Sequence, residues 1–164
     1  SEVVLDAKAK GFTEPDPRDD LSGLDVARKA LILSRDCGAK MELSDIAVEN
    51  LVPESLREVD VKTFLSKLPD VDASYEKLKK DAESKGNVLR YMAVIENGKV
   101  SIELKQVDSQ HPFYNLSGSD NMIVFTTERY KTNPLVIKGP GAGAEVTAAG
   151  VFAEIITISN YMAS

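Results

Sequence analysis

The chain has 164 residues, of which 43% are hydrophobic and 28% are charged. These proportions are typical of a globular protein and exclude collagen, coiled coil and low-complexity disorder. Its 20 basic and 26 acidic residues give a net charge of −6, which disfavours nucleic acid as a partner because phosphate backbones repel an acidic chain. No run approaches the roughly 20 apolar residues of a membrane span, so we expect no membrane partner. A single cysteine, Cys37, fits a reducing compartment.

Helices are expected to predominate in the first half of the chain. Pro15 and Pro17 indicate extended backbone without a helix over residues 12–20. Ser22 can cap the helix that follows, and Gly11 and Gly38 are placed to end successive helices. The elements predicted here are helices at 1–10, about 25–37, 61–68 and 74–84, and short strands at 41–43 and 47–48.

Strands are expected to predominate in the second half. Two alternating segments flank Asn97-Gly98, which is a strong signal for a tight hairpin. The mixed order of helices and strands predicts an α+β fold with a mixed sheet. The elements predicted here are strands at 88–95, 100–107, 122–127 and 135–138, and a helix at 144–161.

The segment 14–29 is the first candidate site. Stiff proline backbone suits a site that must stay rigid. Asp25 and Lys29 lie four residues apart on one helical face, where carboxylates keep a lysine charged and able to donate a proton. In the alternative reading, Asp25 completes a capping box with Ser22 and Lys29 forms only a surface ion pair. The carboxylates that precede Arg28 and Lys29 are Glu14, Asp16, Asp19, Asp20 and Asp25.

The glycine-rich turn at 139–144 is the second candidate. It matches the pattern G-x-G-x-x-A between a strand and a helix, where backbone amides can approach a phosphate. A complete nucleotide domain needs a further strand after such a turn, so the turn is either the returning edge of one or a close contact between helix and strand. For zinc at the single histidine, His111, the chain offers no second His and no second Cys. We therefore predict a loop or packing role for it and no metal site.

Several motifs closely resemble those of homoserine dehydrogenases. Residues 11–29, GFTEPDPRDDLSGLDVARK, resemble the signature of that family. The end of the chain is similar to the homoserine dehydrogenase half of bifunctional aspartokinase–homoserine dehydrogenases. Such enzymes interconvert aspartate 4-semialdehyde and homoserine with NAD(P)H, on the route to threonine, isoleucine and methionine. The other matching motifs are GSDN at 118–121, TERY at 127–130 and GAGAEVTAAGV at 141–151.

The resemblance also implies roles for individual residues. By position, Lys29 matches the proton-donating lysine of the family, and Asp20 matches an acid that supports the substrate and this lysine. Two further acids match homoserine-binding positions, and two glycines match positions that line the nicotinamide nucleotide. These acids are Glu14 and Asp25, and these glycines are Gly11 and Gly143.

The resemblance finally implies an organisation in two domains. Residues 1–133 would form the substrate-binding, catalytic and dimerisation domain. Residues 134–164 would return to a Rossmann domain whose opening half is not in this chain and holds most of the NADP or NAD. We therefore expect a cytoplasmic homodimer that is inactive without that half. The alternative is a non-catalytic dimerisation or scaffold module.

Overall fold

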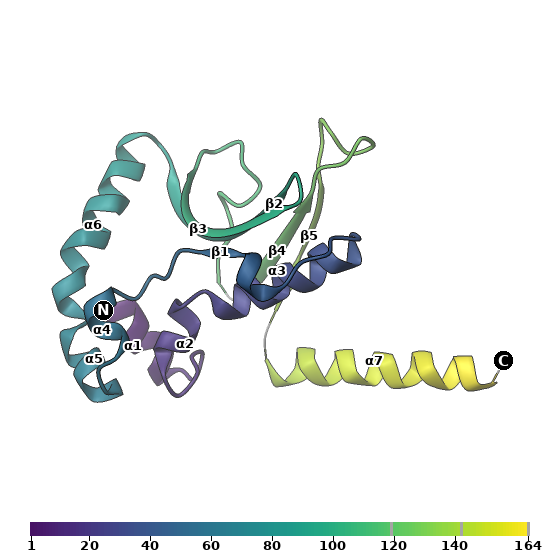
Figure 1. Ribbon diagram of the computed structural model, residues 1–164, viewed down its shortest axis with the longest axis horizontal. Coiled ribbons are helices and arrows are strands. Elements are labelled where there is room, and N and C mark those ends of the chain that lie inside the picture. Colours follow the sequence, from purple (N-terminus) through teal and green to yellow (C-terminus); the bar gives the residue numbers. More distant parts are fainter. Residues whose placement is uncertain (119, 142, 164) are drawn as a thin grey trace. The chain divides into compact units, whose positions relative to one another are not determined.

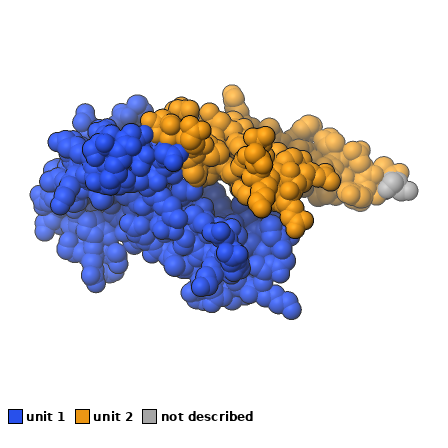
Figure 2. Space-filling view, turned by 90° about the horizontal axis from the view of Figure 1, so that it is seen from above, with its two compact units in different colours: residues 1–108 blue, residues 109–164 orange. Residues whose placement is uncertain are grey.

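The structure is a computed structural model that describes residues 1–118, 120–141 and 143–163. The chain forms two compact units, residues 1–108 and residues 109–164, which Figure 2 shows in different colours. Helices accompany a mixed three-stranded sheet in the first unit, and a two-stranded sheet precedes a long helix in the second. This arrangement confirms the predicted α+β fold. The expected boundary after residue 133 separates a substrate-binding part from a nucleotide-binding part and is not the division into compact units after residue 108. It stays a prediction.

The helices of the first unit include the four that the sequence predicts and two short ones that it does not. Residues 12–20 contain one of the unexpected helices, so the prediction of extended backbone throughout this segment is wrong. Pro17 occupies the first helical position, where its missing N–H costs no hydrogen bond, and the Asp16 carboxylate accepts from the Arg18 N–H at 3.0 Å. The helices are α1 (Glu2–Ala9), α2 (Pro17–Leu21), α3 (Leu24–Asp36), α4 (Glu54–Arg57), α5 (Val61–Lys67) and α6 (Pro69–Ser84).

The cap of α3 also differs from the prediction. Ser22 is the C-cap of α2 and has helical backbone angles, whereas an N-cap residue typically has extended backbone. Gly23 takes the N-cap position instead, with φ +79°. The Ser22 hydroxyl accepts only from the Leu24 N–H, at 3.3 Å. A capping box between Ser22 and Asp25 therefore does not form.

The first sheet has the strand order β1-β3-β2. Strand β1 (Ala47–Val48) runs parallel to β3 (Lys99–Val107), and β2 (Val88–Glu96) pairs with β3 antiparallel. Asn97 and Gly98 both have positive φ, as the predicted tight hairpin requires. The strand predicted at 41–43 does not form, because its last residue begins a 3-10 turn (Leu43–Asp45) that is closed by a capping box.

Two apolar clusters make up the core of the first unit. Helix α3 packs on the sheet through Ala27 and Ala30, which meet the fully buried Ile102 of β3. The second cluster surrounds Phe64 of α5, and side chains of α1 and α2 pack against it. Figure 1 shows α1, α2, α4 and α5 gathered in this part of the unit. The candidate segment 14–29 therefore joins one cluster to the other.

The second unit consists of a hairpin and a helix. Strands β4 (Asp120–Phe125) and β5 (Leu135–Pro140) pair antiparallel, and α7 (Ala144–Ala163) follows. The two strands correspond to those predicted at 122–127 and 135–138. The strand–turn–helix order agrees with the prediction, while membership of a Rossmann domain stays a prediction. Helix α7 is long and apolar enough to cross a membrane by length and composition alone. Counting consecutive apolar residues missed this property, because polar residues such as Glu145, Glu154 and Asn160 interrupt the run. A helix that packs against protein meets the same criterion.

Candidate functional site

Arg18 fixes the proline-rich segment in place. Its guanidinium donates to both carboxylate oxygens of Asp16, from Nε at 3.0 Å to each and from Nη2 at 2.6 Å to one. It also lies 5.5 Å from the ring centre of the buried Phe64. The hydrogen bond from Arg18 lowers the pKa of Asp16. Nη1 donates to three backbone carbonyls next to the end of α4, those of Leu56, Arg57 and Val59. Segment 14–20 is thus tied to α4 and α5.

Two of the predicted acids meet within this segment. The Asp20 carboxylate accepts a hydrogen bond from the backbone N–H of Glu14 at 2.9 Å, across six residues. The side chains of both residues are exposed. Asp20 therefore holds the backbone turn that carries Glu14, which leaves the Glu14 carboxylate open to a ligand from solution.

The predicted pair on α3 forms. Lys29 Nζ lies 2.8 Å from an oxygen of Asp25, and the two side chains are 61% and 63% exposed. An exposed pair of this kind contributes little to stability. The pair nevertheless lies on α3, directly after α2, which carries Asp20, and the turn that carries Glu14. One ammonium group and three carboxylates therefore lie on consecutive elements of the first unit.

The two predicted nucleotide glycines share a backbone feature. Gly11 has φ +73° and Gly143 has φ +124°, and no atom within 4 Å would meet a Cβ at either position. The Gly143 carbonyl accepts from the Thr147 N–H at 3.0 Å, so α7 begins directly after it. Backbone amides at a helix start can approach a phosphate, which applies to Gly143, whereas Gly11 follows the end of α1. Gly141 differs, because a Cβ there would clash with the Asn121 amide. Ser119 and Ala142 of the matched motifs lie outside the described residues.

His111 has the packing role that the sequence predicts. Its ring lies edge-on to Phe113, with ring centres 5.1 Å apart, and its Nδ1 accepts from the Phe113 backbone N–H at 3.1 Å. Both are ordinary contacts within a loop.

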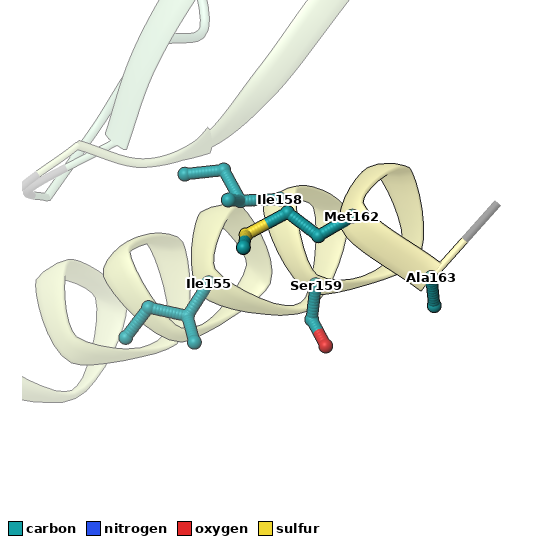
Figure 3. A pocket seen from close by; sticks show the side chains of 5 residues that line it. All are labelled: Ile155, Ile158, Ser159, Met162 and Ala163. Carbon is teal, nitrogen blue, oxygen red and sulfur yellow. The ribbon is translucent and has the colours of Figure 1, made fainter.

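A shallow, mostly apolar hollow lies on the surface of the second unit. It is formed by one face of α7, as Figure 3 shows, and holds no titratable side chain. It therefore offers apolar contact rather than catalysis. The residues that line it are Ile155, Ile158, Ser159, Met162 and Ala163.

The family model for homoserine dehydrogenase matches residues 1–156. The chain is 55% identical over 165 residues to the chloroplastic bifunctional aspartokinase/homoserine dehydrogenase of Daucus carota, an alignment that covers 99% of the chain and 18% of the relative. It is 48% identical over 162 residues to the homoserine dehydrogenase of Schizosaccharomyces pombe, which covers 96% of the chain and 43% of that relative.

Solved structures agree with these relatives. A Candida auris protein of unknown function has a TM-score of 0.90 at 47% identity, over 97% of this chain and 45% of that one. A hyperthermophilic archaeal homoserine dehydrogenase in complex with NADPH has a TM-score of 0.61 at 24% identity, over 98% and 40% of the two chains, and shares the fold. The chain spans less than half the length of these proteins. Since the family model covers nearly all of it, the chain belongs to the homoserine dehydrogenase family.

Proposed function

We propose that this protein serves the NAD(P)H-dependent interconversion of aspartate 4-semialdehyde and homoserine. The observation that carries the proposal is the Lys29–Asp25 pair at 2.8 Å on α3, which follows the anchored turn of Glu14 and the helix α2 that carries Asp20. Family membership supplies the reaction class. The exposed ion pair by itself suits a surface role equally well, so the two observations are needed together.

Each charged group has a definite task in this reaction. Lys29 gives its proton to the carbonyl oxygen of the semialdehyde during reduction and takes a proton back from the hydroxyl during oxidation. Asp25 holds the Lys29 ammonium group in position through their ion pair at 2.8 Å. Glu14 and Asp25 bind the ammonium group of the amino-acid substrate. Asp20 supports the substrate and Lys29, and its carboxylate also accepts from the backbone N–H of Glu14 at 2.9 Å, which holds the turn that carries Glu14.

A nicotinamide nucleotide, NADP or NAD, supplies or accepts the hydride when it is bound. The family motif is our reason for proposing that Gly11 and Gly143 each line this nucleotide, and no neighbouring atom would obstruct an approach at either glycine. Two glycines cannot hold a whole nucleotide, so we propose that most of it is held outside these 164 residues. Residues 134–164 would return to that nucleotide-binding part, and residues 1–133 would carry the substrate.

The remaining expectations form part of the same proposal. We propose a homodimer, with homoserine or aspartate 4-semialdehyde as the small-molecule ligand. The cytoplasm stays our prediction for its location, although the carrot relative is chloroplastic by name.

The proposal is tested in an enzyme that supplies the rest of the nucleotide site. Exchanging the matching segment of the Schizosaccharomyces pombe enzyme for this chain should give a chimera that oxidises homoserine. Lys29→Ala should then lower kcat by roughly 10²–10⁴, the usual loss when a positioned proton donor is removed. Its Kd for NADPH should not change. Glu14→Ala should instead raise KM for homoserine.

Lys85→Ala is the matched control. Lys85, the C-cap of α6, pairs with Asp81 at 2.6 Å, also four residues apart and similarly exposed. Its loss should leave kcat unchanged. If Lys29→Ala behaves like Lys85→Ala in an active chimera, Lys29 is a surface ion pair and the proposed site is wrong.

A further inference from the structure

The corner between α2 and α3 leaves no room for a side chain. A Cβ on Gly23 would lie 1.9 Å from the hydroxyl oxygen of Tyr91 on β2 and 2.9 Å from a methyl carbon of Val48 on β1. With φ +79°, Gly23 also has the left-handed backbone that favours glycine. The Tyr91 hydroxyl oxygen is therefore the atom packed most closely against the Gly23 backbone.

Tyr91 is in turn held by a short strap, residues 49–51. Its hydroxyl donates to the Glu49 carbonyl at 2.7 Å. Glu49 is fixed to β3 twice, since its N–H donates to the Ile102 carbonyl at 2.8 Å and its carboxylate accepts from the Leu104 N–H at 2.9 Å. These hydrogen bonds fix the position of the Tyr91 hydroxyl oxygen relative to β3.

The other end of the strap reaches the helix that carries Asp20. The Leu51 N–H donates to the carbonyl of Leu21, the last residue of α2, at 3.1 Å. The Tyr75 hydroxyl of α6 donates to the Leu51 carbonyl at 2.6 Å. Burial, and then the nearby Glu49 carboxylate, raise the pKa of both tyrosines, so both hydroxyls remain donors near neutral pH.

We propose that Tyr91 is a positioning residue of the homoserine site, whose hydroxyl sets the angle at Gly23 between the helix of Asp20 and the helix of Lys29. This inference rests on the proposed function. Lys29 lies six residues beyond Gly23, about 9 Å along the helix, so a tilt of about 10° at the corner moves it by about 1.5 Å. A displacement of about 1 Å at a reacting group can cost on the order of 10²-fold in rate.

The kinetic test compares two tyrosines whose hydroxyls bind the same strap. Tyr91 and Tyr75 each donate to one of its backbone carbonyls, at 2.7 Å and 2.6 Å, but it is the Tyr91 hydroxyl oxygen that would lie 1.9 Å from a Cβ on Gly23. In the active chimera, Tyr91→Phe should lower kcat by about 10-fold or more while the Kd for NADPH stays unchanged. Tyr75→Phe should change kcat by less than about 2-fold, with a similar shift in unfolding temperature, because it loses the same kind of hydrogen bond.

A second measurement reports on the contact itself, without activity. Gly23→Ala should lower the unfolding temperature of this chain less in the Tyr91→Phe background than in the unchanged chain. The reason is that the oxygen 1.9 Å from the added Cβ is then absent, although the Val48 methyl carbon at 2.9 Å, the ring carbon of residue 91 at 3.0 Å and the strain of φ +79° remain.

The outcomes separate the two proposals. Equal kcat values for Tyr91→Phe and Tyr75→Phe in an active chimera would overturn the positioning role alone, as would additive effects of Gly23→Ala and Tyr91→Phe on unfolding. A chimera that folds but never oxidises homoserine would overturn the proposed function, and the positioning role with it.

Discussion

Phe64 should be the side chain whose loss costs the first unit most stability. Its ring is fully buried between α4, α5 and α6, with Val52, Leu56 and Leu68 around it. Burying a phenylalanine removes about 150–250 Å² from water, which at about 25 cal/mol per Å² gives an upper bound of about 4–6 kcal/mol. Phe64→Ala should therefore lower the free energy of unfolding by about 3–5 kcal/mol, including the cavity it leaves.

The matched control is the same change at an exposed position. Phe12 is 73% exposed, so Phe12→Ala should cost less than about 1 kcal/mol. Urea unfolding followed by circular dichroism measures both variants. If Phe64→Ala does not fold, Phe64→Leu keeps the comparison, because it retains most of the volume and should cost about 1–2 kcal/mol. Equal losses for Phe64→Ala and Phe12→Ala would refute the assignment of the second core.

Three further predictions concern pH, nucleotide and assembly. Arg18 lowers the pKa of Asp16, so ionised Asp16 stabilises the fold at pH values above the ordinary carboxyl pKa, and this contribution is lost as pH falls through the lowered pKa. Arg18→Met should therefore flatten the fall of the urea midpoint between about pH 5 and pH 3. Arg35→Met, which removes an exposed ion pair, should leave that fall unchanged. The 164-residue chain alone should bind NADPH with a Kd weaker than about 1 µM by calorimetry, and a tighter value would show that the nucleotide site lies largely within it. Sedimentation at micromolar concentration should give twice the chain mass, and a clean monomer would contradict the proposed homodimer.

Local patterns predicted the elements whose cause is local. The hairpin between β2 and β3 follows from Asn97-Gly98, two residues that accept positive φ, between alternating segments. The pair Asp25–Lys29 follows from helical spacing alone. These features depend on neighbours within four residues, so the chain needed no tertiary context to reveal them.

The supports of the candidate site depend on distant contacts and could not be predicted in this way. Arg18 reaches carbonyls about 40 residues later, and the Tyr91 hydroxyl bonds to a carbonyl 42 residues earlier. Nothing in the local sequence distinguishes Tyr91 from any other strand tyrosine. One signal was available for α2, since an aspartate directly before a proline can begin a helix with the proline at its first position.

The residues proposed for chemistry are exposed, whereas the residues that hold them in place are largely buried. Substitutions in the two groups should therefore affect catalysis and stability differently. Lys29 and Asp25 are both more than 60% exposed, so their mutual attraction is screened by water and adds little to folding. Arg18, in the first turn of α2, and Gly23, at the start of α3, are by contrast largely covered. A charged pair in open solvent can act on a substrate only if its backbone is already in place, because it gains no orientation from packing of its own. Changes at Lys29 should therefore alter catalysis at constant stability, whereas changes at Arg18 or Gly23 should alter both together.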